Sequence, residues 1–98
     1  MNFDKDSAVA KARQDLAKRL KINETEVSAS VSEKDFPDMS LGAPAKGEMS
    51  GQMISSGWEI KLSAGGKNYE YRADKHQLRL KNFKGTNHVI ESRILGRE

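Results

Sequence analysis

The residues of this chain that could do chemistry are few and widely separated. Its 98 residues include two histidines, His76 and His88, and no cysteine. Protein zinc sites are built mainly from thiolate and imidazole ligands grouped at short spacings, so the sequence predicts no metal centre. Without cysteine, neither a disulfide nor a thiolate nucleophile can form. We therefore expect no metal and no cofactor.

A serine hydrolase would need a serine, a histidine and a carboxylate to converge in space. Ser40, His76 and Asp38 are the residues that could do so, which makes a small hydrolase the third functional candidate. Asp38 and Ser40 have a more common use, because Asp and Ser side chains accept backbone N–H hydrogen bonds in turns. We expect a protein that is not an enzyme.

The elements that position these residues begin with a helix predicted at about 7–21. Its apolar residues recur every three or four positions on one face: Val9, Ala12, Leu16 and Leu20. Asp6 or Ser7 can cap its N-terminus. Residues 27–31 then alternate between apolar and polar side chains, which indicates a half-buried strand.

Residues 58–73 carry the clearest pattern, that of a hairpin with Gly65-Gly66 at the turn. Counting outward from this turn pairs the apolar residues on one face: Trp58 with Ala73, Ile60 with Tyr71, and Leu62 with Tyr69. The other face receives pairs of opposite charge: Lys61 with Glu70, and Glu59 with Arg72. Both matches support this register, because cross-strand neighbours stabilise a sheet in this way.

A third strand follows the turn at Asp74-Lys75. This turn would place Tyr71 opposite Leu78, Tyr69 opposite Leu80, and Glu70 opposite Arg79. A four-residue turn fits nearly as well. The C-terminal tail, about 85–98, is either a short helix or disordered.

These elements predict one domain, 1–98, of α+β class. We expect an N-terminal helix packed on one face of a mostly antiparallel sheet of about four strands, a two-layer sandwich. The aromatic residues Trp58, Tyr69 and Tyr71 could stack on bases, but they share the face that the helix must cover. We interpret them as core.

Charge and hydropathy restrict the partners. The net charge is +3, and the basic excess lies at the two ends of the chain, at 1–23 and 74–98. Nucleic-acid binding usually needs a concentrated basic stripe, so we expect no nucleic-acid partner. The alternative, a nucleic-acid or anionic-surface binder, would use Lys11, Lys18, Arg19, Arg79 and Lys81. No run is apolar enough to span a membrane, and no leader is recognisable in the first ten residues.

A long irregular loop, about 36–52, separates the first strand from the hairpin. Loops longer than about 12–15 residues are usually functional or disordered. This loop could be a flap over one end of the core or a recognition loop on a rigid scaffold. We expect Asp38 and Ser40 to fix a corner, Leu41 to tuck beneath it, and residues 45–52 to be the mobile tip. The candidate binding residues are Asp38, Met39, Ser40, Leu41, Lys46, Glu48 and Met49.

Two segments, FPDMSLGAP at 36–44 and GGKNYEYR at 65–72, resemble a family of small uncharacterised bacterial domains. The pattern of that family is aromatic-Pro-Asp-x-Ser-Leu-Gly-Cys-Pro, then Gly-Gly-x-x-Tyr-Glu-Tyr-His. Here Ala43 stands in place of the cysteine and Arg72 in place of the histidine, and a second cysteine expected near Lys81 is also absent. The resemblance therefore implies a loop that packing alone must hold.

The order of elements is also similar to that of PepSY-like domains, which are extracytoplasmic modules linked with peptidase inhibition or regulation. We expect a non-enzymatic protein-binding module with a protein or peptide partner, for which a peptidase is one candidate. We expect a monomer. The resemblances imply an extracytoplasmic location, with the cytoplasm as the alternative.

Overall fold

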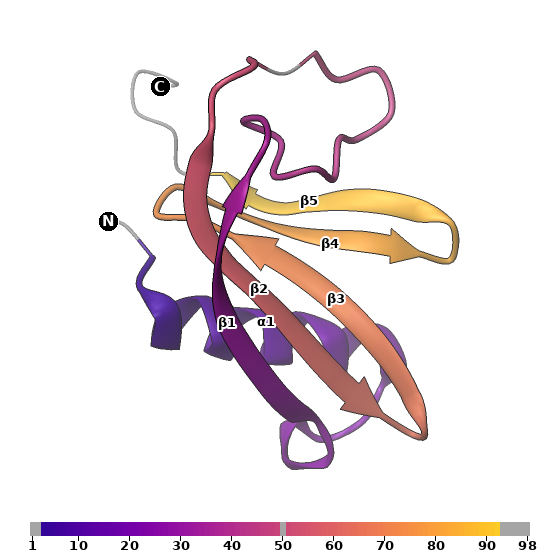
Figure 1. Ribbon diagram of the computed structural model, residues 1–98. Helices are drawn as coiled ribbons and strands as arrows, with labels where there is room; N and C mark the ends of the chain where they lie inside the picture. The colour runs from indigo at the N-terminus through magenta and orange to yellow at the C-terminus, as the bar shows by residue number, and fades with distance from the viewer. Residues whose placement is uncertain (1–2, 50, 93–98) are drawn as a thin grey trace.

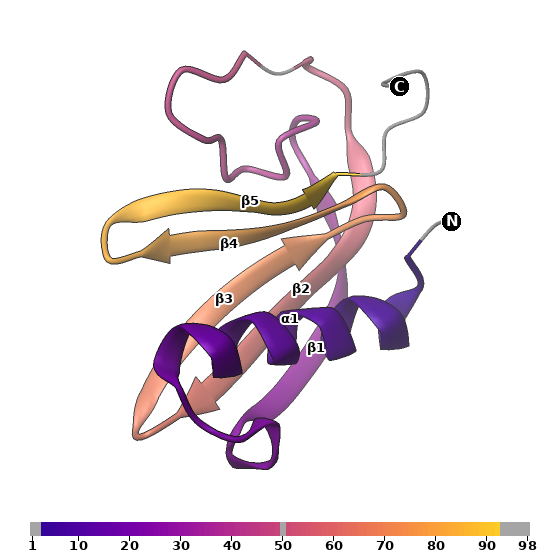
Figure 2. The same cartoon turned by 180° about the vertical axis from the view of Figure 1, so that it is seen from behind.

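The computed structural model describes residues 3–49 and 51–92 (Figure 1). Helix α1 (Lys5–Leu20) and the 3-10 helix η1 (Glu24–Glu26) precede five strands. The strands are β1 (Ser28–Phe36), β2 (Ser55–Ala64), β3 (Lys67–Ala73), β4 (Gln77–Phe83) and β5 (Thr86–Ser92). They form one antiparallel sheet in the order β1-β2-β3-β4-β5, and α1 lies across one face (Figure 2). The predicted α+β fold is confirmed, with five strands where about four were expected.

Helix α1 begins earlier than predicted because Asp4, rather than Asp6 or Ser7, is its N-cap. The Asp4 carboxylate accepts a hydrogen bond from the Ser7 backbone N–H at 2.8 Å, and the Ser7 hydroxyl accepts one from the Asp4 N–H at 2.9 Å. This reciprocal capping box satisfies N–H groups that have no partner within the helix. At the other end, Lys21 adopts a left-handed conformation (φ 58°) and ends the helix.

The core lies between α1 and the sheet. The helix buries Ala8, Ala12, Leu16 and Ala17, whereas Val9 and Leu20 of the predicted stripe are partly buried. Against them pack the inward-facing residues of the strands, including Ile60, Leu62, Tyr71, Leu78 and Leu80. Tyr71 is fully buried, and Trp58 and Tyr69 pack against this core while partly exposed. The interpretation as core is confirmed for Tyr71, whereas Trp58 and Tyr69 lie at the margin of the core.

Tyr71 also ties the sheet to the helix through a polar contact. Its hydroxyl donates a hydrogen bond to Asp15 Oδ2 at 2.7 Å, and Arg19 Nε donates to the same oxygen at 2.7 Å. Burial raises the pKa of the Tyr71 hydroxyl well above its usual value, and the hydrogen bond to Asp15 raises it further. Tyr71 therefore remains a neutral donor throughout the ordinary pH range.

The β2–β3 hairpin has the predicted register in every pair. Leu62 lies opposite Tyr69, Ile60 opposite Tyr71 and Trp58 opposite Ala73, while Lys61–Glu70 and Glu59–Arg72 occupy the other face. Gly65 and Gly66 both adopt positive φ, as a tight turn of this kind requires.

The predicted register of the β3–β4 pair is wrong by two residues. Tyr71 lies opposite Leu80, Ala73 opposite Leu78, and Glu70 opposite Lys81. The turn is the four-residue one, Asp74 to Gln77. The Asp74 carboxylate accepts hydrogen bonds from the backbone N–H groups of His76 (2.7 Å) and Gln77 (3.0 Å), which favours this turn. A shift of two residues keeps each side chain on its predicted face.

Part of the segment expected as a short helix or a disordered tail is a strand. β5 pairs with β4 through Thr86–Ser92, with register shifts between Leu78 and Arg79 and between Leu80 and Phe83. Residues 93–98 of the expected tail lie outside the described residues. β1 and β5 are the two edges of the sheet.

Candidate functional site

The loop between β1 and β2, described at residues 37–49 and 51–54, folds back over the sheet face opposite α1, and Figure 1 shows it beside β5. It begins with a hydrogen-bonded corner. The Asp38 carboxylate accepts hydrogen bonds from the Ser40 N–H (3.0 Å), the Ser40 hydroxyl (2.7 Å) and the Gly42 N–H (3.1 Å). These bonds, led by that from the Ser40 hydroxyl, lower the pKa of Asp38. Leu41 lies fully buried beneath the corner, so Asp38, Ser40 and Leu41 have the expected placement.

The loop rests on two arginines that the sheet presents side by side. Arg72 of β3 lies directly opposite Arg79 of β4, on the face away from α1. Like charges directly opposite each other destabilise a sheet, and both side chains are nearly inaccessible, at 10% and 5% exposure. Such a pair needs acceptors close by, because buried charges are costly unless they are paired and hydrogen-bonded.

The loop supplies most of these acceptors. Arg72 Nη1 donates to the Leu41 carbonyl at 2.9 Å, and Arg79 Nη1 donates to the Ala43 carbonyl at 3.2 Å. Glu48 accepts two hydrogen bonds from Arg79, at 2.5 and 2.7 Å. The remaining neighbours are within the sheet: Arg72 Nε donates to Glu70, and Arg79 Nε donates to Gln77.

Packing adds to these hydrogen bonds. Phe36, fully buried at the end of β1, lies 5.4 Å below the Arg72 guanidinium, within cation–π distance. Gly42 adopts a positive φ of 69°, and a Cβ there would come within 2.5 Å of Arg72 Nη1. Glycine is therefore required both by the backbone conformation and by the close approach of the arginine.

Two further side chains hold the loop from below. Gln77 Nε2 donates to the Met39 carbonyl at 2.6 Å, and Asn87 Nδ2 of β5 donates to the Pro44 carbonyl at 2.9 Å. The first arm of the loop, which contains Met39, also meets the second arm, which contains Gly51. The Met39 N–H donates a hydrogen bond to the Gly51 carbonyl at 3.0 Å. The segment from Asp38 to Glu48 is consequently fixed to the sheet at several points. This differs from the expected mobile tip at 45–52, since Glu48 is one of those points.

The structure divides the predicted binding residues into two groups. Asp38, Ser40, Leu41 and Glu48 support the loop, through the contacts described above. Met39, Lys46 and Met49 are exposed to solvent. Two exposed apolar residues, Met53 and Ile54, belong with this second group, although they are absent from the predicted set. The sequence signal for them is the adjacent apolar pair Met53-Ile54, which stands among polar and glycine residues just before β2.

The arginine pair was missed because the predicted register placed Glu70 opposite Arg79. In the observed register Arg72 faces Arg79 instead. With the four-residue turn, the sequence alone would have shown two cations in direct opposition. That arrangement indicates that something else must cover this part of the sheet.

The alternative sites have less support from the geometry. Ser40 is fully buried and its hydroxyl donates to Asp38, and no hydrogen bond joins it to His76 among the described residues. Of the five proposed basic residues, Arg79 is buried against Glu48, Arg19 pairs with Asp15 and Lys11 pairs with Glu91. Residues 3–49 and 51–92 contain no group of His, Cys, Asp and Glu suited to a metal ion.

Comparison with known proteins identifies a family but no activity. Residues 9–81 match the family described as Domain of unknown function (DUF8738). The chain belongs to this family. The match extends from α1 to β4 and includes the whole β1–β2 loop. No curated protein and no solved structure shows significant similarity to the chain. Within the described part of the chain, no helix is both long and apolar enough to cross a membrane.

Proposed function

We propose that this member of the family is a non-enzymatic protein-binding module that contacts its partner through the β1–β2 loop. The observation that carries this proposal is the exposure of four large apolar side chains on a loop whose base is fixed. The exposed fractions are 43% for Met39, 97% for Met49, 66% for Met53 and 73% for Ile54.

Exposed apolar residues gathered on one segment are typical of interaction surfaces. Methionine suits such a surface because its unbranched thioether adapts to irregular neighbours. Met39 also lies against the second arm of the loop, since a Cβ on Gly51 would come within 2.8 Å of its sulfur. Met39 and the segment 51–54 therefore form one continuous region of the loop.

The fixed base reduces the entropic cost of binding. Asp38, Arg72 and Arg79 hold the first arm of the loop in one conformation before a partner arrives. Less conformational freedom is then lost on association, which increases the affinity for a given contact area. A peptidase is the class of partner suggested by the resemblance to PepSY-like domains. Inhibition of a panel of peptidases would test that narrower proposal separately.

The methionines allow a direct test of the loop. Three of the four in the chain, Met39, Met49 and Met53, lie on it. Photoreactive methionine incorporated at these positions places the crosslinker on the proposed surface. In an extract of the source cells we expect a discrete crosslinked protein, and a strongly reduced yield from Ile54→Asp, which retains every methionine.

Asn68→Asp is the control, because it adds the same charge at an exposed position of β3, next to the β2–β3 turn and outside the contacts that hold the loop. It should give the crosslink of the wild-type protein. Absence of a discrete crosslink, or an equal yield from Ile54→Asp, would show that the loop is a structural cover for the arginine pair and no more.

A further inference from the structure

A second surface, independent of the loop, is the free edge of β1. β1 runs for nine residues and pairs with β2 without a register shift, from Ser28–Ser63 to Phe36–Ser55. On its other side it has no strand partner in the described part of the chain. The opposite edge strand, β5, has two register shifts. Bulges protect sheet edges from pairing with other chains, and β1 lacks this protection.

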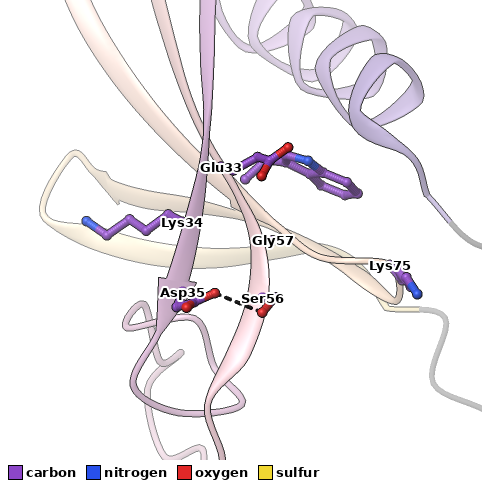
Figure 3. A pocket seen from close by; sticks show the side chains of 7 residues that line it. Glu33, Lys34, Asp35, Ser56, Gly57 and Lys75 are labelled. Carbon is purple, nitrogen blue, oxygen red and sulfur yellow. Dashed lines mark hydrogen bonds between the residues drawn. The ribbon is translucent and has the colours of Figure 1, made fainter.

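The side chains of β1 also leave the edge accessible. Residues 28–35 are exposed apart from Val31, which is half-buried, and three of them are serines on the face away from α1. Lys34, which could discourage an added strand, points away from Glu33 (Figure 3) and pairs with Glu59 of β2 at 3.2 Å. None of these small or engaged side chains obstructs the backbone groups along the edge.

The other face of β1 carries unbalanced negative charge. Glu33 and Asp35 share that face with Ala29 and Val31, and they line a shallow pocket of about 300 Å³ whose other charged lining residues are Lys34 and Lys75. Asp35 accepts a hydrogen bond from Ser56 at 2.8 Å (Figure 3), and neither carboxylate forms an ion pair with a described residue. Lys34 also lines the pocket, but its ammonium group pairs with Glu59 on the opposite face of β1. Among the residues that line the pocket, Lys75 is therefore the cation left to balance the two carboxylates of Glu33 and Asp35.

We propose that the β1 edge binds an extended peptide segment of another protein by strand addition, and that basic side chains of this peptide face Glu33 and Asp35. Directly opposite residues on neighbouring strands lie about 4.5–5.5 Å apart, and opposite charges at such positions stabilise the pairing. The next residue along the same face of β1 is Val31. An antiparallel ligand therefore has the pattern basic-x-basic-x-apolar, with main-chain hydrogen bonds supplying affinity and alternate side chains supplying specificity.

Charge argues against a second copy of this chain as the occupant. The corresponding face of β1 carries Ala29, Val31, Glu33 and Asp35, and no cation. Antiparallel pairing of two β1 strands would bring four carboxylates together on one face, where like charges repel. A basic peptide would instead place cations opposite Glu33 and Asp35, and opposite charges attract.

The test uses a synthetic peptide, acetyl-Thr-Lys-Thr-Lys-Thr-Val-Thr-amide, titrated into ¹⁵N-labelled protein. We expect chemical-shift changes concentrated at residues 28–36 and slower amide exchange in β1. Replacing both lysines of the peptide by glutamate should abolish these changes. N-methylation of alternate peptide nitrogens should also abolish them, because it removes main-chain donors.

Glu33→Gln/Asp35→Asn should weaken binding roughly tenfold, from the loss of two cross-strand charge pairs. Glu24→Gln/Glu26→Gln is the matched control, since it makes the same change of net charge before the start of β1 and should bind as the wild-type protein does. The proposal is overturned by no binding at millimolar peptide, by shifts outside β1, by equal binding of the N-methylated peptide, or by sedimentation showing dimers formed through β1. None of these outcomes depends on the apolar residues of the β1–β2 loop.

Discussion

Arg79 donates two hydrogen bonds to the carboxylate of Glu48, although the two residues are 31 positions apart in the chain. The guanidinium is 5% exposed and the carboxylate 29%. Two parallel hydrogen bonds between these planar groups are stronger and more directional than a single one. This contact fixes the loop at the point where the chain turns toward its exposed methionines.

Replacing either partner should therefore loosen the loop and destabilise the fold. We expect Arg79→Met to cost about 1.5–3 kcal/mol, because hydrogen bonds to charged groups contribute in this range. A double-mutant cycle with Glu48→Gln, followed by urea unfolding, measures the coupling between the two side chains. Strictly additive effects would mean that the contact contributes nothing to stability.

Acid should release the loop before it unfolds the core. The hydrogen bonds from Arg79 lower the pKa of Glu48, and those from Ser40 and Gly42 lower the pKa of Asp38. Both carboxylates therefore stabilise the folded loop fully above their ordinary values of 4.5 and 3.8, and this stabilisation is lost as pH falls through the lowered values.

The amide signals of Leu41 and Ala43 report this transition by NMR. We expect them to be constant from pH 7 to about 5 and to change below about 4.5. Glu48→Gln should remove part of the change, because glutamine does not titrate. Loop signals that move between pH 7 and 5 would assign the transition to some other group.

The contact between helix and sheet predicts a large effect at Leu16, which is fully buried. Leu16→Ala should cost about 2–5 kcal/mol, from lost apolar burial and the cavity left behind. Lys18→Ala is a suitable control, because Lys18 is exposed on the same helix and should change stability by less than about 0.5 kcal/mol. Similar unfolding midpoints for the two variants would contradict the packing of α1.

The hydroxyl of Tyr71 should contribute separately from its ring. Tyr71→Phe keeps the buried ring and removes the 2.7 Å hydrogen bond to Asp15, so we expect a loss of about 1–3 kcal/mol. Tyr69→Phe removes a hydroxyl for which the described residues provide no partner, and it should be nearly neutral. Equal losses for the two variants would show that the Asp15 contact is not what stabilises the Tyr71 side chain.

A measurement of nucleic-acid binding distinguishes the proposed protein-binding function from the nucleic-acid-binding alternative. We expect no binding to a mixed oligonucleotide even at low salt, where phosphate contacts are strongest. Arg79, Arg19 and Lys11, which the alternative would use, are each paired with an acidic residue. The fluorescence anisotropy of a labelled oligonucleotide, measured with increasing protein at two salt concentrations, is sufficient to detect such binding. Binding that weakens steeply with added salt would restore the alternative.

Much of the scaffold could be read from the sequence because it depends on neighbours in the chain. The β2–β3 register follows from Gly65-Gly66 and from the alternation of side chains around it, since a tight turn leaves no freedom in the count. The corner at Asp38 and Ser40 is equally local, with all three hydrogen bonds spanning four residues or fewer.

The contacts on the outer face of the sheet could not be predicted from the sequence. Arg72 and Arg79 have the charge and spacing of ordinary solvent-exposed strand residues, and Glu48 has those of an ordinary loop residue. Their contacts with the loop join positions 31 to 36 residues apart. No periodicity in the sequence encodes such a separation, because it depends on how the loop closes back over the sheet. The layers and the central register follow from local patterns in the sequence. The burial of two facing arginines beneath the loop does not, because only the folded chain brings their acceptors within hydrogen-bond distance.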